Sequence, residues 1–172
     1  MPDPEFLIRR ASHGDVDLIA HHRAEMFRDI HGLDDAQCAV MYDESLRALE
    51  PLLSSGDYLG WFASPAGEPE RVVGGVGIRL RDMLPSANQR SGAPKVVLGR
   101  QGLIVNVYVE RDWRRRGIAA LLMRRLLEDV KPLGLMNIVL HASPDGRALY
   151  ESLGFTATNE MRYSTPAQLT RP

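Results

Sequence analysis

The chain has 172 residues, of which 44% are hydrophobic, and these values predict one domain, residues 1–172, with a single sizeable core. Basic residues number 21 and acidic residues 22, so the formal net charge is -1, which argues against a general nucleic-acid-binding protein. The single cysteine, Cys38, excludes an intrachain disulfide. The sequence shows neither a secretory signal pattern nor an apolar run of about 20 residues. We therefore expect a cytoplasmic protein that does not enter membranes.

The first half of the chain carries strand and helix patterns in a clear order. Glu5–Ala11 is predicted to be a short strand, and Ser12 or Asp15 can cap the helix that follows it. A second helix is predicted over Asp35–Leu53. Asp57–Ser64 and Arg71–Leu80 are predicted strands on either side of the turn PAGEPE, which indicates a β-hairpin.

A long segment, Arg81–Gln101, separates this hairpin from the next strong pattern. It is rich in Pro, Ser, Gly and Asn, and we predict a loop, because connections of this length in compact domains are often functional lids or disordered. Gly102–Val109 follows and has the strongest strand pattern of the chain. Its odd positions are all apolar, and Asn106 and Tyr108 lie at even positions, so the two sets are expected on opposite faces.

The last third of the chain completes an α+β pattern. It predicts an amphipathic helix over Gly117–Val130, a strand over Asn137–Ala142, a short helix that ends at Gly154, and a final strand over Phe155–Ser164. The order is strand, two helices, three strands, helix, strand, helix, strand. This order indicates a mixed sheet covered by helices, with one strand–helix–strand unit at its centre.

Three further features are interpreted as structural. Gly74–Leu80, GGVGIRL, lacks the third glycine and the following helix of a dinucleotide-binding loop, so it indicates a twisted or bulged strand. His22 and Glu25 could share a helix face as metal ligands, but the sequence shows no third ligand, so we expect a solvated face and no metal site. Cys38 is expected to be a buried apolar thiol.

The segment Glu110–Met123, ERDWRRRGIAALLM, places three arginines and a glycine where a helix begins. The first N–H groups of a helix have no internal partner, and the helix dipole adds partial positive charge there. Gly117 has no side chain and Ala119 has only a methyl group, so a bulky anion can approach the backbone. The arrangement suits a pyrophosphate, and the alternative is a surface helix with solvated arginines.

The segment NVYVERDWRRRGIAALLM resembles the signature of the GNAT superfamily of N-acetyltransferases, which is Arg or Gln, two residues, Gly, one residue, and then Gly or Ala. Arg114, Gly117 and Ala119 fill these places in order. Leu140–Phe155 is similar to a later motif of the family, in which a short helix ends in Leu-Gly-Phe. The two motifs occur in the order that the family shows.

The resemblance implies an α+β fold with a mixed, mostly antiparallel sheet flanked by helices, in which two central strands splay apart. It implies acetyl-CoA as cofactor, with the pantetheine arm on the backbone of Val107 and Val109 and the pyrophosphate on Arg114, Arg115, Arg116, Gly117, Ile118 and Ala119. It also implies that Tyr150 donates a proton to the departing thiolate. The expected reaction is acetyl transfer to a primary amine of a small molecule or peptide, by direct attack in a ternary complex. The alternative is a non-catalytic protein that holds CoA as a sensor or structural ligand.

The acceptor side of the site is less clearly marked. Candidate acceptor contacts are Glu25, Asn106, Tyr108 and His141, and candidates for a general base are Glu25, Asp29, Glu110 and His141, with a water chain as the alternative. Asp145 departs from the family pattern, which often has Asn there, and a carboxylate would sit poorly beside an anionic cofactor. The resemblance leaves the oligomeric state open, since many relatives are homodimers.

Overall fold

The computed structural model describes residues 5–88, 95–158 and 160–163. The elements are β1 (Phe6–Arg10), α1 (Val16–His31), α2 (Asp35–Ser55), β2 (Tyr58–Pro65), β3 (Gly74–Asn88), β4 (Lys95–Val109), α3 (Ile118–Val130), β5 (Asn137–Leu140) and α4 (Arg147–Ser152). The five strands form one sheet in the order β1-β2-β3-β4-β5. All neighbouring pairs are antiparallel except β4 and β5, which are parallel. The expected α+β class and mixed, mostly antiparallel sheet are confirmed.

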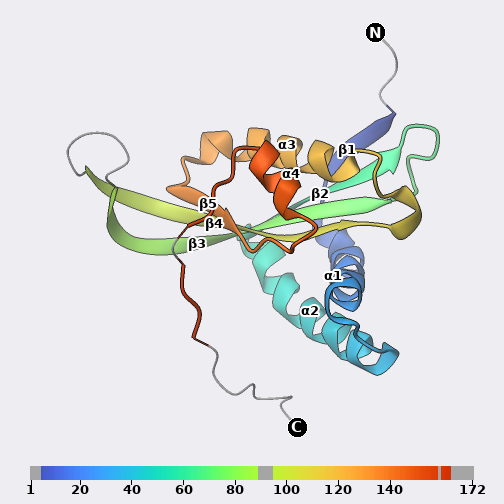
Figure 1. Ribbon diagram of the computed structural model, residues 1–172. Helices are drawn as coiled ribbons and strands as arrows, with labels where there is room; N and C mark the ends of the chain where they lie inside the picture. The colour runs from blue at the N-terminus through green and yellow to red at the C-terminus, as the bar shows by residue number, and fades with distance from the viewer. Residues whose placement is uncertain (1–4, 89–94, 159, 164–172) are drawn as a thin grey trace.

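Helices cover both faces of the sheet. Helices α1 and α2 lie on one face, and α3 lies on the other with α4 beside it (Figure 1). The α3 face is filled by fully buried side chains that include Trp61, Ile78, Leu122 and Leu126. A second cluster, around Ile19, packs between α1, α2 and the opposite face of the sheet. Burial on both faces fixes the central strands, so these strands can hold a site rigidly.

Local sequence explains where the two N-terminal helices begin and end. Gly32 adopts a left-handed conformation with φ 69° and ends α1. Asp34 begins α2 with a capping box, because its side chain accepts the N–H of Gln37 while the Gln37 side chain accepts the N–H of Asp34. None of the helices in the described ranges is long and apolar enough to span a bilayer.

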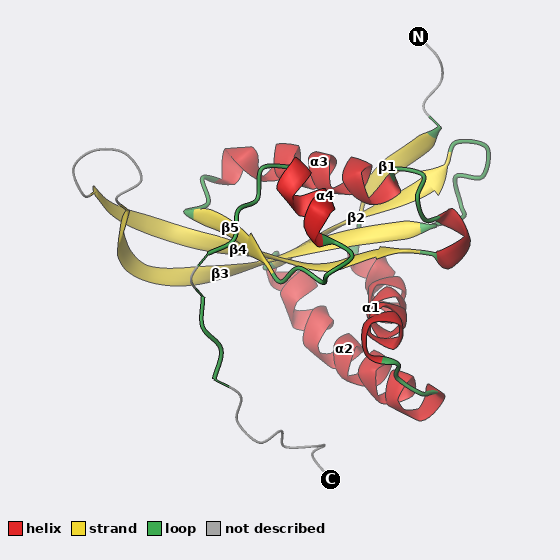
Figure 2. Cartoon of the chain, in the orientation of Figure 1, coloured by secondary structure: helices red, strands yellow, loops and turns green. Residues whose placement is uncertain are grey.

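The segment Arg81–Gln101 is not the predicted loop. Its described residues extend β3 and β4 into a long two-stranded arm that projects beyond the other strands (Figure 2). Pro85 favoured a loop in the prediction, because proline cannot donate a hydrogen bond to a regular strand ladder. In the structure it lies at a register shift between Met83 and Ser86, where the regular ladder is interrupted and its missing N–H is tolerated. The tip, residues 89–94, lies outside the described residues.

The predicted final strand, Phe155–Ser164, is also wrong for the residues that the structure describes. Residues 155–158 and 160–163 form no strand and run as an irregular segment near β5 (Figure 2). A cavity of about 650 Å³ lies between this segment, β5 and α4. The segment therefore lacks the adjacent backbone partner that a strand needs, and β5 pairs only with β4 within the described part of the chain.

The expected alternation along β4 is broken at one residue. Asn106 has φ 57°, and at this point one residue of β3, Val76, lies opposite two residues of β4, Asn106 and Val107, which is a β-bulge. Ile104 packs with the core under α3 and Val105 packs with the α1–α2 cluster, as alternation requires. After the bulge the parity changes, so Val107 faces α3 and the odd positions do not share one face.

Candidate active site

The strands β4 and β5 separate in the middle of the sheet. Their ladder joins Gln101–Ile104 to Asn137–Leu140 and ends there. Strand β4 continues to Val109, so its last five residues have no partner on the β5 side within the described chain. The splayed central strands expected from the sequence are confirmed.

The backbone of β4 is available along this gap. Glu110 donates its N–H to the carbonyl of Val73 at 2.9 Å, toward β3. Successive residues of a strand direct their backbone groups to opposite sides, so the N–H groups of Val109 and Val107 point into the gap. The Val109 carbonyl already accepts a hydrogen bond from Arg114 Nε at 2.9 Å, so only its N–H remains for a ligand.

The gap leads to the N-terminus of α3. Arg115 and Gly117 both have left-handed backbones, with φ of 63° and 76°. The first backbone hydrogen bond of α3 runs from the N–H of Leu121 to the carbonyl of Gly117. No described side chain caps the helix. The N–H groups of Ile118 and Ala119 therefore have no intrahelical partner, and the space beside the Gly117 Cα is open to 4 Å. These N–H groups form a cradle of backbone donors that could bind an anion.

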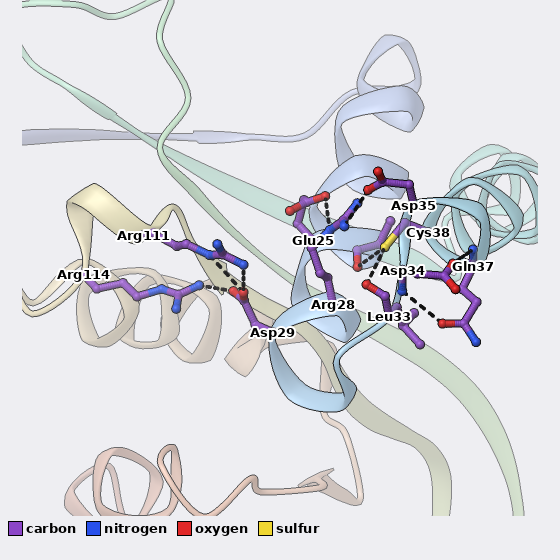
Figure 3. A network of polar contacts seen from close by, with 11 residues as sticks. Glu25, Arg28, Asp29, Leu33, Asp34, Asp35, Gln37, Cys38, Arg111 and Arg114 are labelled. Atoms are coloured by element: carbon purple, nitrogen blue, oxygen red, sulfur yellow. Dashed lines mark hydrogen bonds and ion pairs between the residues drawn. The ribbon is translucent and has the colours of Figure 1, made fainter.

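The predicted phosphate-binding residues contribute to this cradle in different ways. Ile118 is 1% exposed and its side chain belongs to the core, so it can offer only its N–H. Arg114 and Arg111 both reach across to Asp29 of α1 and pair with its carboxylate (Figure 3). Arg116 stacks on Trp113, with its guanidinium carbon 4.7 Å from the ring centroid. Arg114 is therefore held toward α1 by Asp29. The positive charge that remains next to the cradle comes from Arg115 and Arg116, in the turn before α3.

Tyr150 lies on α4 beside the same core. Its ring packs against the hydrophobic core under α3, as Val107 and Leu140 do, and it meets Phe155 edge-on with ring centroids 6.2 Å apart. Partial burial raises the pKa of Tyr150, so the hydroxyl keeps its proton at neutral pH. Among the described residues the hydroxyl has no hydrogen-bond partner, and the side chain lines the cavity of about 650 Å³ next to β5.

The candidate acceptor residues fall into two groups. Asn106 and Tyr108 are buried on the α1 side of β4, with exposures of 4% and 8%. His141 lies on the other side, after β5, and its Nε2 is 3.3 Å from Glu160. Glu25 is bound to Arg28 at 3.2 Å. The structure therefore brings Asn106 and Tyr108 together and places His141 apart from them, whereas Glu25 lies on α1 and its charge helps to raise the pKa of Tyr108.

Asp29 is poorly suited to act as a general base. Burial of its carboxyl raises the pKa, but hydrogen bonds from Arg114 and Arg111 outweigh burial and hold the pKa below its usual value. Its side chain is 20% exposed and both of its oxygens accept from these arginines. A carboxylate in this state accepts a proton from an amine less readily than a free one.

The solvated face expected around His22 is wrong for this residue. His22 is 2% exposed, because α1 lies flat enough on the sheet to bury a broad stripe. Its ring lies 5.0 Å from the Tyr108 ring and 5.7 Å from that of Phe62. Burial lowers the pKa of His22 to about 4, so the imidazole is neutral, and no metal-ligand group of three occurs among the described residues. Cys38 is buried, as predicted.

Sequence reasoning missed Arg23 and Tyr58. Arg23 Nη1 donates to Asn106 Oδ1 at 2.7 Å, and Asn106 Nδ2 donates to the hydroxyl of the buried Tyr58 at 3.1 Å. A signal was present, since Arg23 lies four residues after Ile19 and four before Phe27, on the apolar stripe of α1. A charge in such a stripe is unusual and indicates a polar contact beneath the helix.

Comparisons with known proteins agree with this architecture. The model of the Acetyltransferase (GNAT) family matches residues 19–155. Over 102 residues the chain is 31% identical to the ribosomal protein bS18-alanine N-acetyltransferase of Salmonella typhimurium (strain LT2), an alignment that covers 55% of this chain and 68% of that protein.

Solved structures extend the match over most of the chain. A GCN5-related N-acetyltransferase from Ralstonia eutropha JMP134 aligns with a TM-score of 0.78 and 30% identity, covering 93% of this chain and 98% of that one. A protein described as a predicted acetyltransferase from Clostridium acetobutylicum, solved with acetyl-CoA, aligns with a TM-score of 0.76 and 25% identity, covering 93% of this chain and 96% of that one. As its two sequence motifs indicate, the chain belongs to the GNAT family of acetyltransferases.

Proposed function

We propose that this protein transfers an acetyl group from acetyl-CoA to a primary amine of a small molecule or peptide, by direct attack in a ternary complex. The observation that carries the proposal is the path of free backbone N–H groups that, within the described chain, follows the open edge of β4 and then the N-terminus of α3. Its strand portion suits an extended amide-containing arm, and its helix portion suits a pyrophosphate. A solved relative that contains acetyl-CoA supports this choice of cofactor.

The residues along the path fit the cofactor by their chemistry. The N–H of Val109 and the carbonyl of Val107 can pair with the amides of a pantetheine arm, because both groups point into the gap. The N–H groups of Gly117, Ile118 and Ala119 can bind phosphate oxygens, with charge supplied by Arg115 and Arg116, which lie in the exposed turn.

The reaction needs an oxyanion donor and a proton donor. Bound acetyl-CoA supplies an acetyl thioester, whose transfer to a neutral amine forms an amide and releases a thiol. The N–H of Val107, next to the bulge, is directed into the gap and can stabilise the carbonyl oxygen as it gains negative charge. Tyr150 holds a proton that it can donate to the leaving sulfur.

Isothermal titration of acetyl-CoA into the protein tests the cofactor site directly. Gly117→Glu places a carboxylate in the open cradle, so we expect acetyl-CoA binding to be lost. Gly56→Glu is the matched control, because Gly56 has the same φ of 76° and equally open surroundings, but lies at the end of α2. Loss in both variants, or in neither, would contradict the proposed cradle.

Turnover is then measured by thiol release with a panel of amines. The panel includes peptides that begin with alanine, because one relative is named for acetylation of a ribosomal-protein alanine. Thiol release that depends on one class of amine supports the transferase proposal. Tight acetyl-CoA binding without thiol release from any amine would favour the non-catalytic, CoA-holding alternative.

A further inference from the structure

Arg23 is a partly buried guanidinium without an opposite charge nearby. Burial lowers the pKa of Arg23, and among the described residues no carboxylate lies within ion-pair distance of it. Its contacts are the neutral Asn106 oxygen at 2.7 Å and the face of Phe27, with the guanidinium carbon 4.9 Å from the ring centroid. Arg28, one turn further along α1, pairs with both Glu25 and Asp35. A desolvated cation without a counter-ion is costly, so its retention points to a bound anion.

The Asn106 contact leaves part of the guanidinium available. Only Nη1 donates to Asn106, and the structure shows no described partner for Nε or Nη2. These two groups form the planar edge that binds a carboxylate or phosphate through two parallel hydrogen bonds. Asn106 is itself fixed, since it is 4% exposed and donates to the Tyr58 hydroxyl. The guanidinium is therefore held at one end and free at the other.

The position of Arg23 relates it to the transfer site. Asn106 directly precedes Val107, whose N–H faces the gap where β4 and β5 separate. The Asn106 side chain lies on the α1–α2 face of the sheet, opposite α3. A molecule that approaches the gap from this face would come near the Arg23–Asn106 pair, one residue away from Val107.

We propose that Arg23 binds an oxyanion, a carboxylate or a phosphate, carried by the acceptor amine, and so selects amines that bear a negative group. The inference rests on the proposed acetyl transfer and adds the acceptor class to it. A neutral amine would leave the guanidinium desolvated and unpaired, whereas an anionic amine compensates its charge. Discrimination against the neutral analogue would thus come from α1, the helix that packs on β4.

The first test measures binding without turnover. Protein saturated with CoA is titrated with γ-aminobutyrate, its neutral amide and aminopropylphosphonate, while NMR follows the Nε–H signals of Arg23 and Arg28. The Arg23→Lys variant assigns the first signal and Arg28→Lys the second. We expect a saturable shift at Arg23 alone, with the carboxylate, the phosphonate or both, and none with the amide. The responding probe identifies the oxyanion. No shift at Arg23, or equal unsaturable shifts at both arginines, would overturn the inference.

The second test separates anion binding from a structural role. Arg23→Gln removes the charge and leaves a shorter amide donor at this position, and Arg28→Gln is the control on the same helix. We expect Arg23→Gln to weaken binding of the anionic probe by about 10- to 100-fold, the usual effect of losing a charged hydrogen bond, and to leave acetyl-CoA and amide binding unchanged. Equal weakening of all three ligands would show that Arg23 only positions Asn106. Because acetyl-CoA binding is measured separately, failure of the cofactor site is distinguishable from failure of this inference.

Discussion

Replacing Tyr150 by Phe removes one hydroxyl and little else. The ring would keep its contact with Phe155 and with the core, and the hydroxyl has no hydrogen-bond partner among the described residues. We therefore expect the free energy of unfolding to change by no more than about 0.5 kcal/mol. General acids contribute about 10²- to 10⁴-fold to turnover, so kcat should fall by that factor, equivalent to about 3–5 kcal/mol in the barrier.

The assay combines thiol release at saturating acetyl-CoA and amine with a calorimetric Kd for acetyl-CoA. Because partial burial raises the pKa of Tyr150 above its reference of about 10, the acid form persists over about pH 7–9, and its ionisation should not lower wild-type kcat there. Tyr42→Phe is the control, since Tyr42 also loses a hydroxyl, one that donates to Asp17 at 2.7 Å on the exposed side of the helices. An unchanged kcat in Tyr150→Phe, or an equal drop in the control, would refute the proton-donor role.

Three further changes test the fold and the charges around the cradle. Gly77→Ala would place a Cβ 1.9 Å from the buried Tyr58 hydroxyl, so thermal denaturation should show a loss of ~1–3 kcal/mol; a loss near zero would mean that the ring moves freely. Hydrogen bonds from Arg9 lower the pKa of Asp15 to about 2, against about 3.9 unfolded, so this stability is present above about pH 4 and is lost as pH falls toward 2. Urea unfolding should therefore show that Asp15→Asn is less stable than the wild type by ~1–2 kcal/mol at neutral pH, after allowing for solvent screening, and as stable as the wild type near pH 2. A stability difference that persists in acid would contradict this origin. Asp29→Asn removes a negative charge beside the cradle, so calorimetry should show tighter acetyl-CoA binding at low salt and a smaller gain at high salt; weaker binding would show that the carboxylate is needed to orient the loop.

The strand–turn–helix around the cradle could be predicted from sequence because its signals are local. The apolar run before Val109 predicts a strand, and Gly117 marks a turn whose φ of 76° favours a residue without Cβ. The amphipathic stripe of α3 is long and regular, and Ile118, Leu122, Leu126 and Val130 along it are all buried. Family membership follows from the same short motifs.

The arm and the C-terminal segment could not be predicted in this way, because their structure depends on distant partners. Residues such as Ala87 become a strand only because Val96 lies opposite, and the composition around Pro85 resembles that of a loop. Phe155 begins a segment with strand-like residues, but a cavity separates it from β5. Strand propensity predicts a strand poorly where no neighbouring backbone is available, whereas a charge within the apolar stripe of a helix, such as Arg23, indicates a buried polar contact.

The bulge at Asn106 explains why the open edge and the acceptor side occur at the same place. A left-handed backbone at a residue other than glycine costs about 1–2 kcal/mol, and two hydrogen bonds, from Arg23 and to Tyr58, offset it at about 1 kcal/mol each. The extra residue increases the local twist of β4 and changes its parity, so β5 stops pairing two residues before the bulge. The Val107 N–H is thereby freed toward the gap. The residues that hold the bulge come from α1 and β2, so the geometry of the transfer site depends on the helix layer that also faces the acceptor. An anion that engages Arg23 would act on the same hydrogen-bonded group that keeps the gap open.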